Sequence, residues 1–153
     1  MAIKVEHRIG IQAPPDVIWE IVGDLSRWKD WNPLYTSAEG TLAFGATLTL
    51  TLVLPGGKPQ VIKPVIESWT PEELIHWRLS MMGGLVKSIR YIEIEKLTET
   101  GCIFSNGEIF DGFIGRRLPK RMRRNIKAGF EAMGEAVRTR AEAAWRARAQ
   151  GPT

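Results

Sequence analysis

The last third of the chain contains the one pattern that is long enough for an extended amphipathic helix. Between about residue 115 and residue 148, apolar side chains recur at spacings of four and three, which places them on one helical face. Pro119 either opens the straight part of this helix or kinks its first turn. The apolar stripe consists of Leu118, Met122, Ile126, Phe130, Met133, Val137 and Ala141.

The region from residue 35 to 111 is typical of short strands. In segment 47–54, leucine alternates with threonine or valine, so one face of this strand is expected to be buried. Pro64 interrupts the next strand pattern and suggests an edge position or a bulge. Because the turns are short, neighbouring strands are expected to be antiparallel. Strands are predicted at 3–12, 47–54, 60–69, 74–80, 86–97 and 102–111.

The order of these elements predicts an α+β fold. After the first strand, Pro14, Pro15 and Asp16 begin a short helix, and a second helical turn is expected over residues 25–31. An antiparallel sheet with one buried face needs a cover, and the last helix is the only long one available. We predict a helix-grip domain over residues 1–148, with a frayed end at 149–153. A curved antiparallel sheet of six to seven strands and two short helices would wrap around the long C-terminal helix.

The composition excludes several classes of function. No stretch approaches the ~20 apolar residues of a membrane-spanning helix, and the charged N-terminus does not resemble a signal peptide. The single cysteine, Cys102, fits a reducing compartment, so we expect a cytoplasmic protein. His7 and His76 have no further ligands at metal-binding spacing, and no phosphate loop or dinucleotide fingerprint is present. We therefore expect no metal and no cofactor.

Three short motifs occur in an order that resembles the START-like, or SRPBCC, superfamily, which includes birch-pollen-allergen-like proteins and polyketide cyclases/dehydratases. The chain reads IQAPPDVIWE at residues 11–20, WKDWNP at 28–33 and EIFDG at 108–112. The resemblance covers nearly the whole chain and implies a helix-grip fold with a cavity for a hydrophobic ligand. It implies no catalytic residues, because the superfamily has no universal catalytic motif and its fold supports many functions.

Two charged residues are expected to face the interior. If Ile92 points into the grip, so does Arg90, and if Phe110 points inward, so do Glu108 and Asn106. Arg90 and Glu108 would then lie opposite each other and orient a polar group of a ligand. In an enzyme, Glu108 would act as general acid or base and Arg90 would stabilise an enolate. The alternatives are a purely structural ion pair and a register in which Arg90 faces solvent.

Several large apolar residues are candidates for the wall of a pocket. Aromatic rings and methionine provide adaptable apolar area for flat or irregular ligands. Taken singly, each of these residues fits ordinary core packing better than a pocket wall, but as a set they favour a cavity. The candidate wall consists of Trp31, Trp77, Phe104, Phe110, Phe130 and Met133.

Positive charge is concentrated at the start of the last helix. Residues 116–148 carry eleven Lys or Arg and three Glu, whereas the rest of the chain has ten basic and fourteen acidic residues. Cations at a helix N-terminus oppose its dipole, so helix stability does not explain them. A solvated face is the favoured interpretation, and docking on an anionic membrane or an acidic partner is the alternative. Nucleic acid is not the partner we expect. The basic surface consists of Arg116, Arg117, Lys120, Arg121, Arg123, Arg124 and Lys127.

These patterns leave three functions open. The first is binding of a hydrophobic small molecule, lipid-like, polyketide-like or aromatic, between sheet and helix. The second is a metal-free enzyme of the cyclase/dehydratase type that uses Glu108 as acid or base. The third is an interaction module that acts through the basic start of the last helix.

Overall fold

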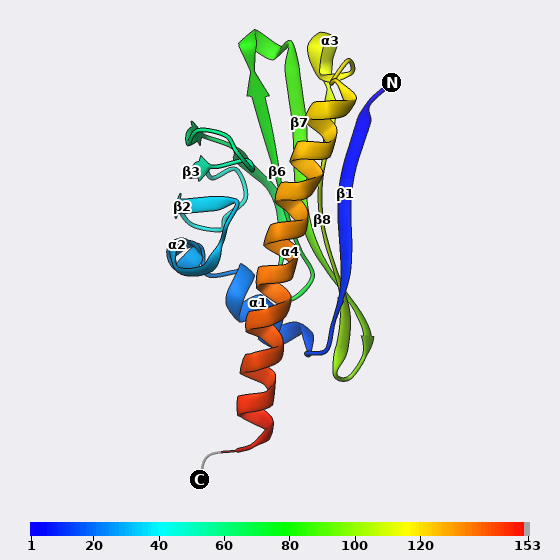
Figure 1. Cartoon of the computed structure of the whole chain (residues 1–153). Helices are drawn as coiled ribbons and strands as arrows, with labels where there is room; N and C mark the ends of the chain where they lie inside the picture. Colours follow the sequence, from blue (N-terminus) through cyan, green and yellow to red (C-terminus); the bar gives the residue numbers. More distant parts are fainter. Residues whose placement is uncertain (152–153) are drawn as a thin grey trace.

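A five-stranded antiparallel sheet forms the larger layer of the protein (Figure 1). The computed structural model describes residues 1–151. The strand order is β1-β8-β7-β6-β5. Strands β5 to β8 therefore pair with their neighbours in sequence, and β1 pairs with β8. The strands are β1 (Ile3–Ile11), β5 (Val65–Thr70), β6 (Leu74–Met81), β7 (Val86–Thr98) and β8 (Gly101–Asp111).

A smaller sheet of three strands lies beside it, in the order β2-β3-β4. Its strands are β2 (Tyr35–Glu39), β3 (Thr49–Leu52) and β4 (Gln60–Ile62). The strand predicted over residues 60–69 is therefore divided between the two sheets at Pro64. Proline has no N–H to donate to a ladder, whereas its carbonyl accepts a hydrogen bond from the Leu48 amide at 2.8 Å.

The short helices follow the predicted positions. Helix α1 (Pro15–Val22) has proline at its first position, and the 3-10 turn η1 (Leu25–Arg27) leads into α2 (Trp28–Trp31). The fully buried Trp28 donates from its indole nitrogen to the Val22 carbonyl at 3.1 Å. The Asn32 side chain then accepts from the Leu34 and Tyr35 amides, which directs the chain into β2.

The long helix α4 (Lys120–Ala149) begins immediately after Pro119, which is extended at φ −62° and ψ 148°. Pro119 therefore opens the straight helix, and the preceding turn is a separate short helix, α3 (Gly112–Gly115). The apolar stripe is buried from Ile126 onward, but Met122 is 48% exposed. The end predicted to fray, 149–153, lies partly outside the described residues, and within them α4 continues to Ala149.

Helix α4 runs along one face of the five-stranded sheet, with α1, α2 and the small sheet beside it (Figure 1). The predicted α+β helix-grip fold is confirmed. Residues 1–151 contain eight strands in two sheets, where the sequence predicted six to seven strands in one curved sheet. No helix in this part of the chain is both long and apolar enough to cross a membrane.

Candidate ligand-binding site

Arg90 is the most deeply buried charged residue on the inner face of the sheet, at 1% exposure. A guanidinium has five N–H donors, and five acceptors surround this one. No carboxylate lies within ion-pair distance of it among the described residues. Its acceptors are Tyr35 Oη at 3.0 Å, the Tyr91 carbonyl at 2.7 Å, the Gly107 carbonyl at 3.2 Å, Asn106 Oδ1 at 2.9 Å and Met133 Sδ at 3.5 Å.

This network links several elements of the fold. Asn106 donates onward to the Phe130 carbonyl of α4 at 3.2 Å, and the guanidinium lies 4.3 Å from the centre of the Phe130 ring. Arg90 therefore connects β2, β7, β8 and α4 through hydrogen bonds and a cation–π contact. Because its donors are already engaged, Arg90 positions its neighbours and has no free N–H for a ligand.

Glu108 lies directly opposite Arg90 in the β7–β8 register, as the sequence suggested. The two side chains nevertheless form no ion pair within 4.0 Å, and Glu108 is partly exposed. Burial raises the pKa of the Glu108 carboxyl, and the Ser88 hydroxyl and the Arg90 charge only partly oppose this shift. Such a carboxyl holds its proton to a higher pH than an ordinary glutamate and is suited to transfer it.

Two further polar groups of the interior are weakly satisfied. The buried Ser88 hydroxyl has no partner besides Glu108, whose pKa it lowers, and the Trp31 indole nitrogen is buried without a hydrogen-bond partner among the described residues. Ser88 lies two residues before Arg90 and so on the same face of β7. Burial also raises the pKa of the Tyr35 hydroxyl, against the opposing charge of Arg90. Buried polar groups usually have partners, so unpaired ones are suited to receive polar atoms of a ligand.

The candidate wall residues come together in the core between sheet and helix. Trp77 and Phe130 both lie over the Arg90 guanidinium, and Met133 accepts from it. Phe104 and Phe110 belong to the same buried cluster. The structure thus groups these residues, but their close packing is equally that of a core, and their role in binding stays a prediction.

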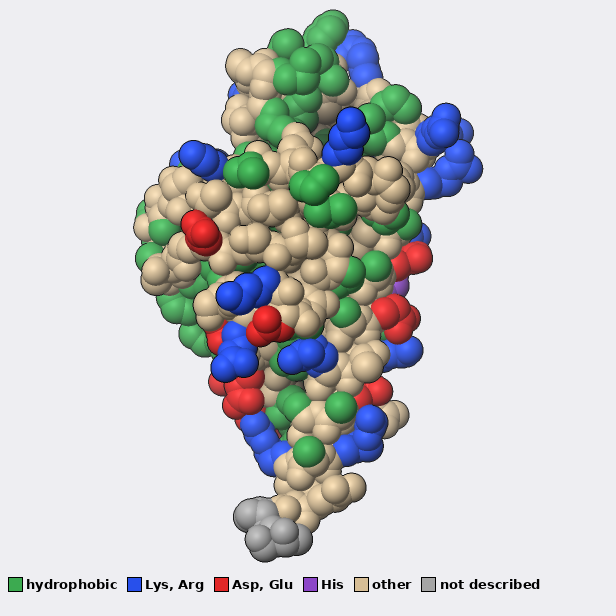
Figure 2. Space-filling view, turned by 60° about the vertical axis from the view of Figure 1, so that its left-hand side comes forward, with side chains coloured by type: hydrophobic (Ala, Val, Ile, Leu, Met, Phe, Trp, Pro, Cys, Tyr) green, Lys and Arg blue, Asp and Glu red, His purple; other side chains and the backbone are tan. Residues whose placement is uncertain are grey.

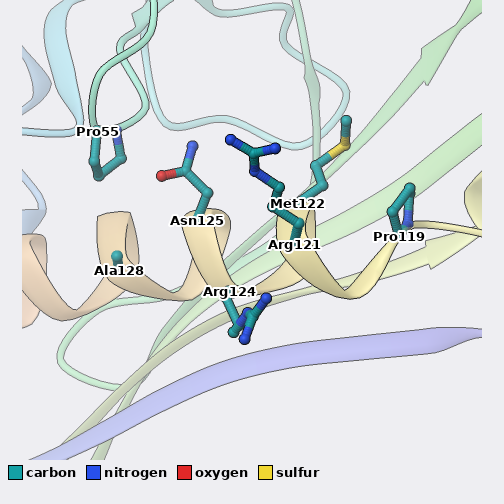
Figure 3. A pocket seen from close by; sticks show the side chains of 7 residues that line it. All are labelled: Pro55, Pro119, Arg121, Met122, Arg124, Asn125 and Ala128. Atoms are coloured by element: carbon teal, nitrogen blue, oxygen red, sulfur yellow. The ribbon is translucent and has the colours of Figure 1, made fainter.

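A groove with a volume of about 700 Å³ opens between the start of α4 and the loop at Pro55. In Figure 3, Met122 and Asn125 lie on the side of α4 that faces Pro55, and Arg124 points the other way. Next to the groove the Pro55 loop packs close to α4. A Cβ atom added at Gly129 of α4 would lie 3.5 Å from Pro55 Cδ. The exposed Met122 therefore continues the apolar stripe of α4 into an opening at the end of the grip.

The two histidines lie on different strands, and His7 is opposite Asn106 of this site in the β1–β8 register. His76 lies on β6 and contacts Glu93 at 2.8 Å. His7 lies on β1 against Gly134 of α4, and its Nδ1 atom is buried without a partner in residues 1–151. Within the same range, no three His, Cys, Asp or Glu side chains cluster as a metal site would require.

The basic residues lie at one end of the molecule, on α4 and just before it. All are exposed except Arg123, which is half-buried. Arg116 pairs with Asp111 at 2.9 Å, and Arg117 lies 4.2 Å from the centre of the Phe113 ring. Within the described part of the chain, no other ion pair involves a residue of the basic surface.

Solved structures share this arrangement of a sheet gripping one long helix. The Zhui aromatase/cyclase from Streptomyces sp. R1128 aligns with a TM-score of 0.76 at 18% identity, over 100% of both chains. Norcoclaurine synthase from Thalictrum flavum, in complex with dopamine and hydroxybenzaldehyde, gives 0.67 at 18% identity over 91% of this chain and 86% of that one. A START superfamily protein from Mycobacterium smegmatis gives 0.64 at 17% identity over 94% and 97%. These likenesses show the class of fold, a helix grip.

The sequence narrows this class to one family. Residues 2–142 match the model of the family described as polyketide cyclase / dehydrase and lipid transport. The chain belongs to this family, whose description combines two roles that both concern hydrophobic molecules. A search of curated proteins finds no match.

Three participants in the site were missed by sequence reasoning. Ser88 shares the face of Arg90 on β7, so its position in the strand was a usable signal. Tyr35 comes from the other sheet, and nothing in the sequence shows that its hydroxyl meets Arg90. Pro55 falls between the predicted strands 47–54 and 60–69, and nothing in the sequence shows that its loop forms one wall of the groove.

Proposed function

We propose that the protein binds a hydrophobic small molecule at the inner face of the sheet, with Glu108 as the polar group that contacts it. The ligand would enter beside Met122, where the apolar stripe of α4 is exposed. The single observation that carries the proposal is the state of Glu108, a partly exposed carboxyl on the inner face of the sheet that has a raised pKa and no ion-pair partner within residues 1–151.

The neighbouring groups support this assignment. The unpaired Trp31 indole offers a donor to a ligand with few polar atoms, and the Ser88 hydroxyl beside Glu108 offers a donor or an acceptor. Arg90 does not contact the ligand in this proposal, because its N–H groups are engaged. It instead fixes Tyr35 and Asn106 around the site. A lipid-like, polyketide-like or aromatic molecule has the required chemistry.

A second candidate function is catalysis of the cyclase/dehydratase type. The raised pKa of Glu108 specifically favours it, because a carboxyl that holds its proton can later give it to a carbonyl or hydroxyl oxygen. The Tyr35 hydroxyl, whose oxygen accepts from Arg90, would be free to donate its proton to a developing enolate. The likeness to an aromatase/cyclase supports the fold needed for such a reaction.

Native mass spectrometry of the purified protein, followed by solvent extraction, separates these functions. The protein is incubated with a poly-carbonyl precursor or a fatty acid, and the bound molecule is then recovered. Recovery of the molecule unchanged supports binding, and recovery of a dehydrated or cyclised product supports catalysis. Glu108→Gln should abolish the conversion, and it should weaken binding only if Glu108 contacts the ligand. A protein that retains neither probe contradicts both functions.

A further inference from the structure

Four large apolar side chains are exposed together at the end of the molecule where α4 begins. We name them the apolar tip: Met82, Leu85, Phe113 and Ile114, with exposed fractions of 64%, 44%, 64% and 37%. They come from the β6–β7 connection, which includes the 3-10 turn η2 (Met82–Gly84), and from α3. Both segments lie at the same end of the molecule in Figure 1.

The fold holds these two segments together. The amides of Ile114 and Gly115 donate to the Leu85 carbonyl at 2.9 and 3.3 Å. Gly112 has a positive φ of 87°, and a side chain there would lie 2.6 Å from the Leu85 carbonyl oxygen. Backbone hydrogen bonds therefore hold the two segments of the apolar tip in place, while its side chains are exposed.

Positive charge surrounds the apolar tip. Residues 81–88 and 112–130 contain eight Lys or Arg and no Asp or Glu. Asp111, at the border, is paired with Arg116. Arg117 lies over the Phe113 ring and donates to the Phe113 carbonyl at 2.6 Å. Figure 2 shows hydrophobic side chains at this end of the molecule with Lys and Arg side chains beside them.

We propose that the apolar tip inserts into the headgroup region of an anionic lipid membrane while the surrounding cations bind its phosphates and carboxylates. Exposed apolar side chains ringed by Lys and Arg match such a surface in both hydrophobicity and charge. RNA fits less well, because Met, Leu and Ile do not stack on bases. A second copy of the chain would present the same positive charge.

The inference goes beyond the proposed function and does not depend on it. If both hold, the groove beside Met122 opens next to the membrane, because Arg121 belongs to the basic surface and also lines the groove. A hydrophobic ligand could then pass between the bilayer and the protein without crossing water.

The test is co-sedimentation with vesicles of phosphatidylcholine alone or of phosphatidylcholine mixed equally with phosphatidylserine. We expect binding to the mixed vesicles alone, weakened by salt. Phe113→Ser should lower the affinity about tenfold, and the pair Lys120→Gln and Arg121→Gln about 25-fold. The matched controls are Leu97→Ser, which removes an apolar side chain of 59% exposure near the opposite end of β7, and Arg140→Gln with Arg146→Gln. These should change little.

Insertion can be observed directly with Phe113→Cys carrying a polarity-sensitive fluorophore, because the native Cys102 is buried. The emission should shift to the blue with mixed vesicles, and the same label at Leu97→Cys should not shift. Binding that loses affinity in the charge variant but not in Phe113→Ser would overturn insertion and indicate purely electrostatic attachment to the vesicle surface. Absence of binding to mixed vesicles at low salt, or dimerisation lost in Phe113→Ser, would also overturn the proposal.

Discussion

Replacing Arg90 by methionine tests whether the buried guanidinium holds the grip together. Methionine keeps an unbranched apolar stem in the same space but removes all five donors. Tyr35 Oη, Asn106 Oδ1 and at least one of the two backbone carbonyls would then lose a donor. At about 1 kcal/mol for each acceptor left unsatisfied, the free energy of unfolding should fall by about 3 kcal/mol.

This loss is smaller than that from breaking a buried ion pair, because no carboxylate within ion-pair distance is left uncompensated. For a domain of this length, about 3 kcal/mol corresponds to a decrease in Tm of about 6–12 °C. Urea unfolding and thermal melts followed by circular dichroism would measure both quantities. Arg78→Met is the matched control, because Arg78 lies on the neighbouring strand with a half-exposed side chain 3.7 Å from Glu67.

Arg78→Met should lower the free energy of unfolding by less than about 1 kcal/mol, since exposed ion pairs contribute little to stability. If Arg90→Met were no more destabilising than Arg78→Met, the structural role assigned to Arg90 would be refuted. Loss of ligand binding without loss of stability would instead indicate that Arg90 contacts the ligand, which is the role suggested from the sequence.

Three further predictions concern the same sheet. Because the pKa of Glu108 is raised in the folded protein, ionisation of Glu108 costs stability as pH rises through that pKa. Glu108→Gln should therefore be at least as stable as wild type at neutral pH in urea titrations, and its advantage should vanish below the ordinary glutamate pKa. Gly107→Ala should lose roughly 3 kcal/mol in the same assay, because its Cβ would lie 2.6 Å from a β1 carbonyl oxygen. Gly10→Ala, with nothing within 4 Å, should not. Tyr91→Phe should lose about 1–2 kcal/mol at neutral pH, because the Tyr91 hydroxyl donates to Glu6. Burial would raise the pKa of Glu6, but this hydrogen bond and nearby cations lower it, so the mutational loss should shrink as Glu6 protonates at acidic pH.

Much of the fold could be predicted because its signals are local. The proline-opened first helix, the leucine–threonine alternation and the four-and-three spacing of the last helix each depend on neighbours in sequence. The division of segment 60–69 between two sheets was not predicted. Pro64 marks a break in a ladder, but the sequence does not say which strand each half joins.

The site could be predicted only in part for a related reason. Period-two alternation placed Arg90 and Glu108 on one face, and the register confirms that they lie opposite each other. It could not show that Arg90 turns to Tyr35 and Asn106 instead of Glu108. That choice depends on a hydroxyl from the second sheet and on an amide held by the Phe130 carbonyl of α4. Side-chain partners across elements distant in sequence leave no local pattern.

The proposed ligand site is tested most directly by amide NMR spectra of the protein titrated with oleic acid and with emodin, a flat hydroxyanthraquinone. The proposal predicts that at least one probe shifts the amide signals of Ser88, Glu108 and Phe130, and that those of the outward-facing Arg78 stay in place. The same titration of Glu108→Gln should show weaker binding of the probe. Unchanged signals at the inner face with both probes at saturating concentration would contradict the proposal.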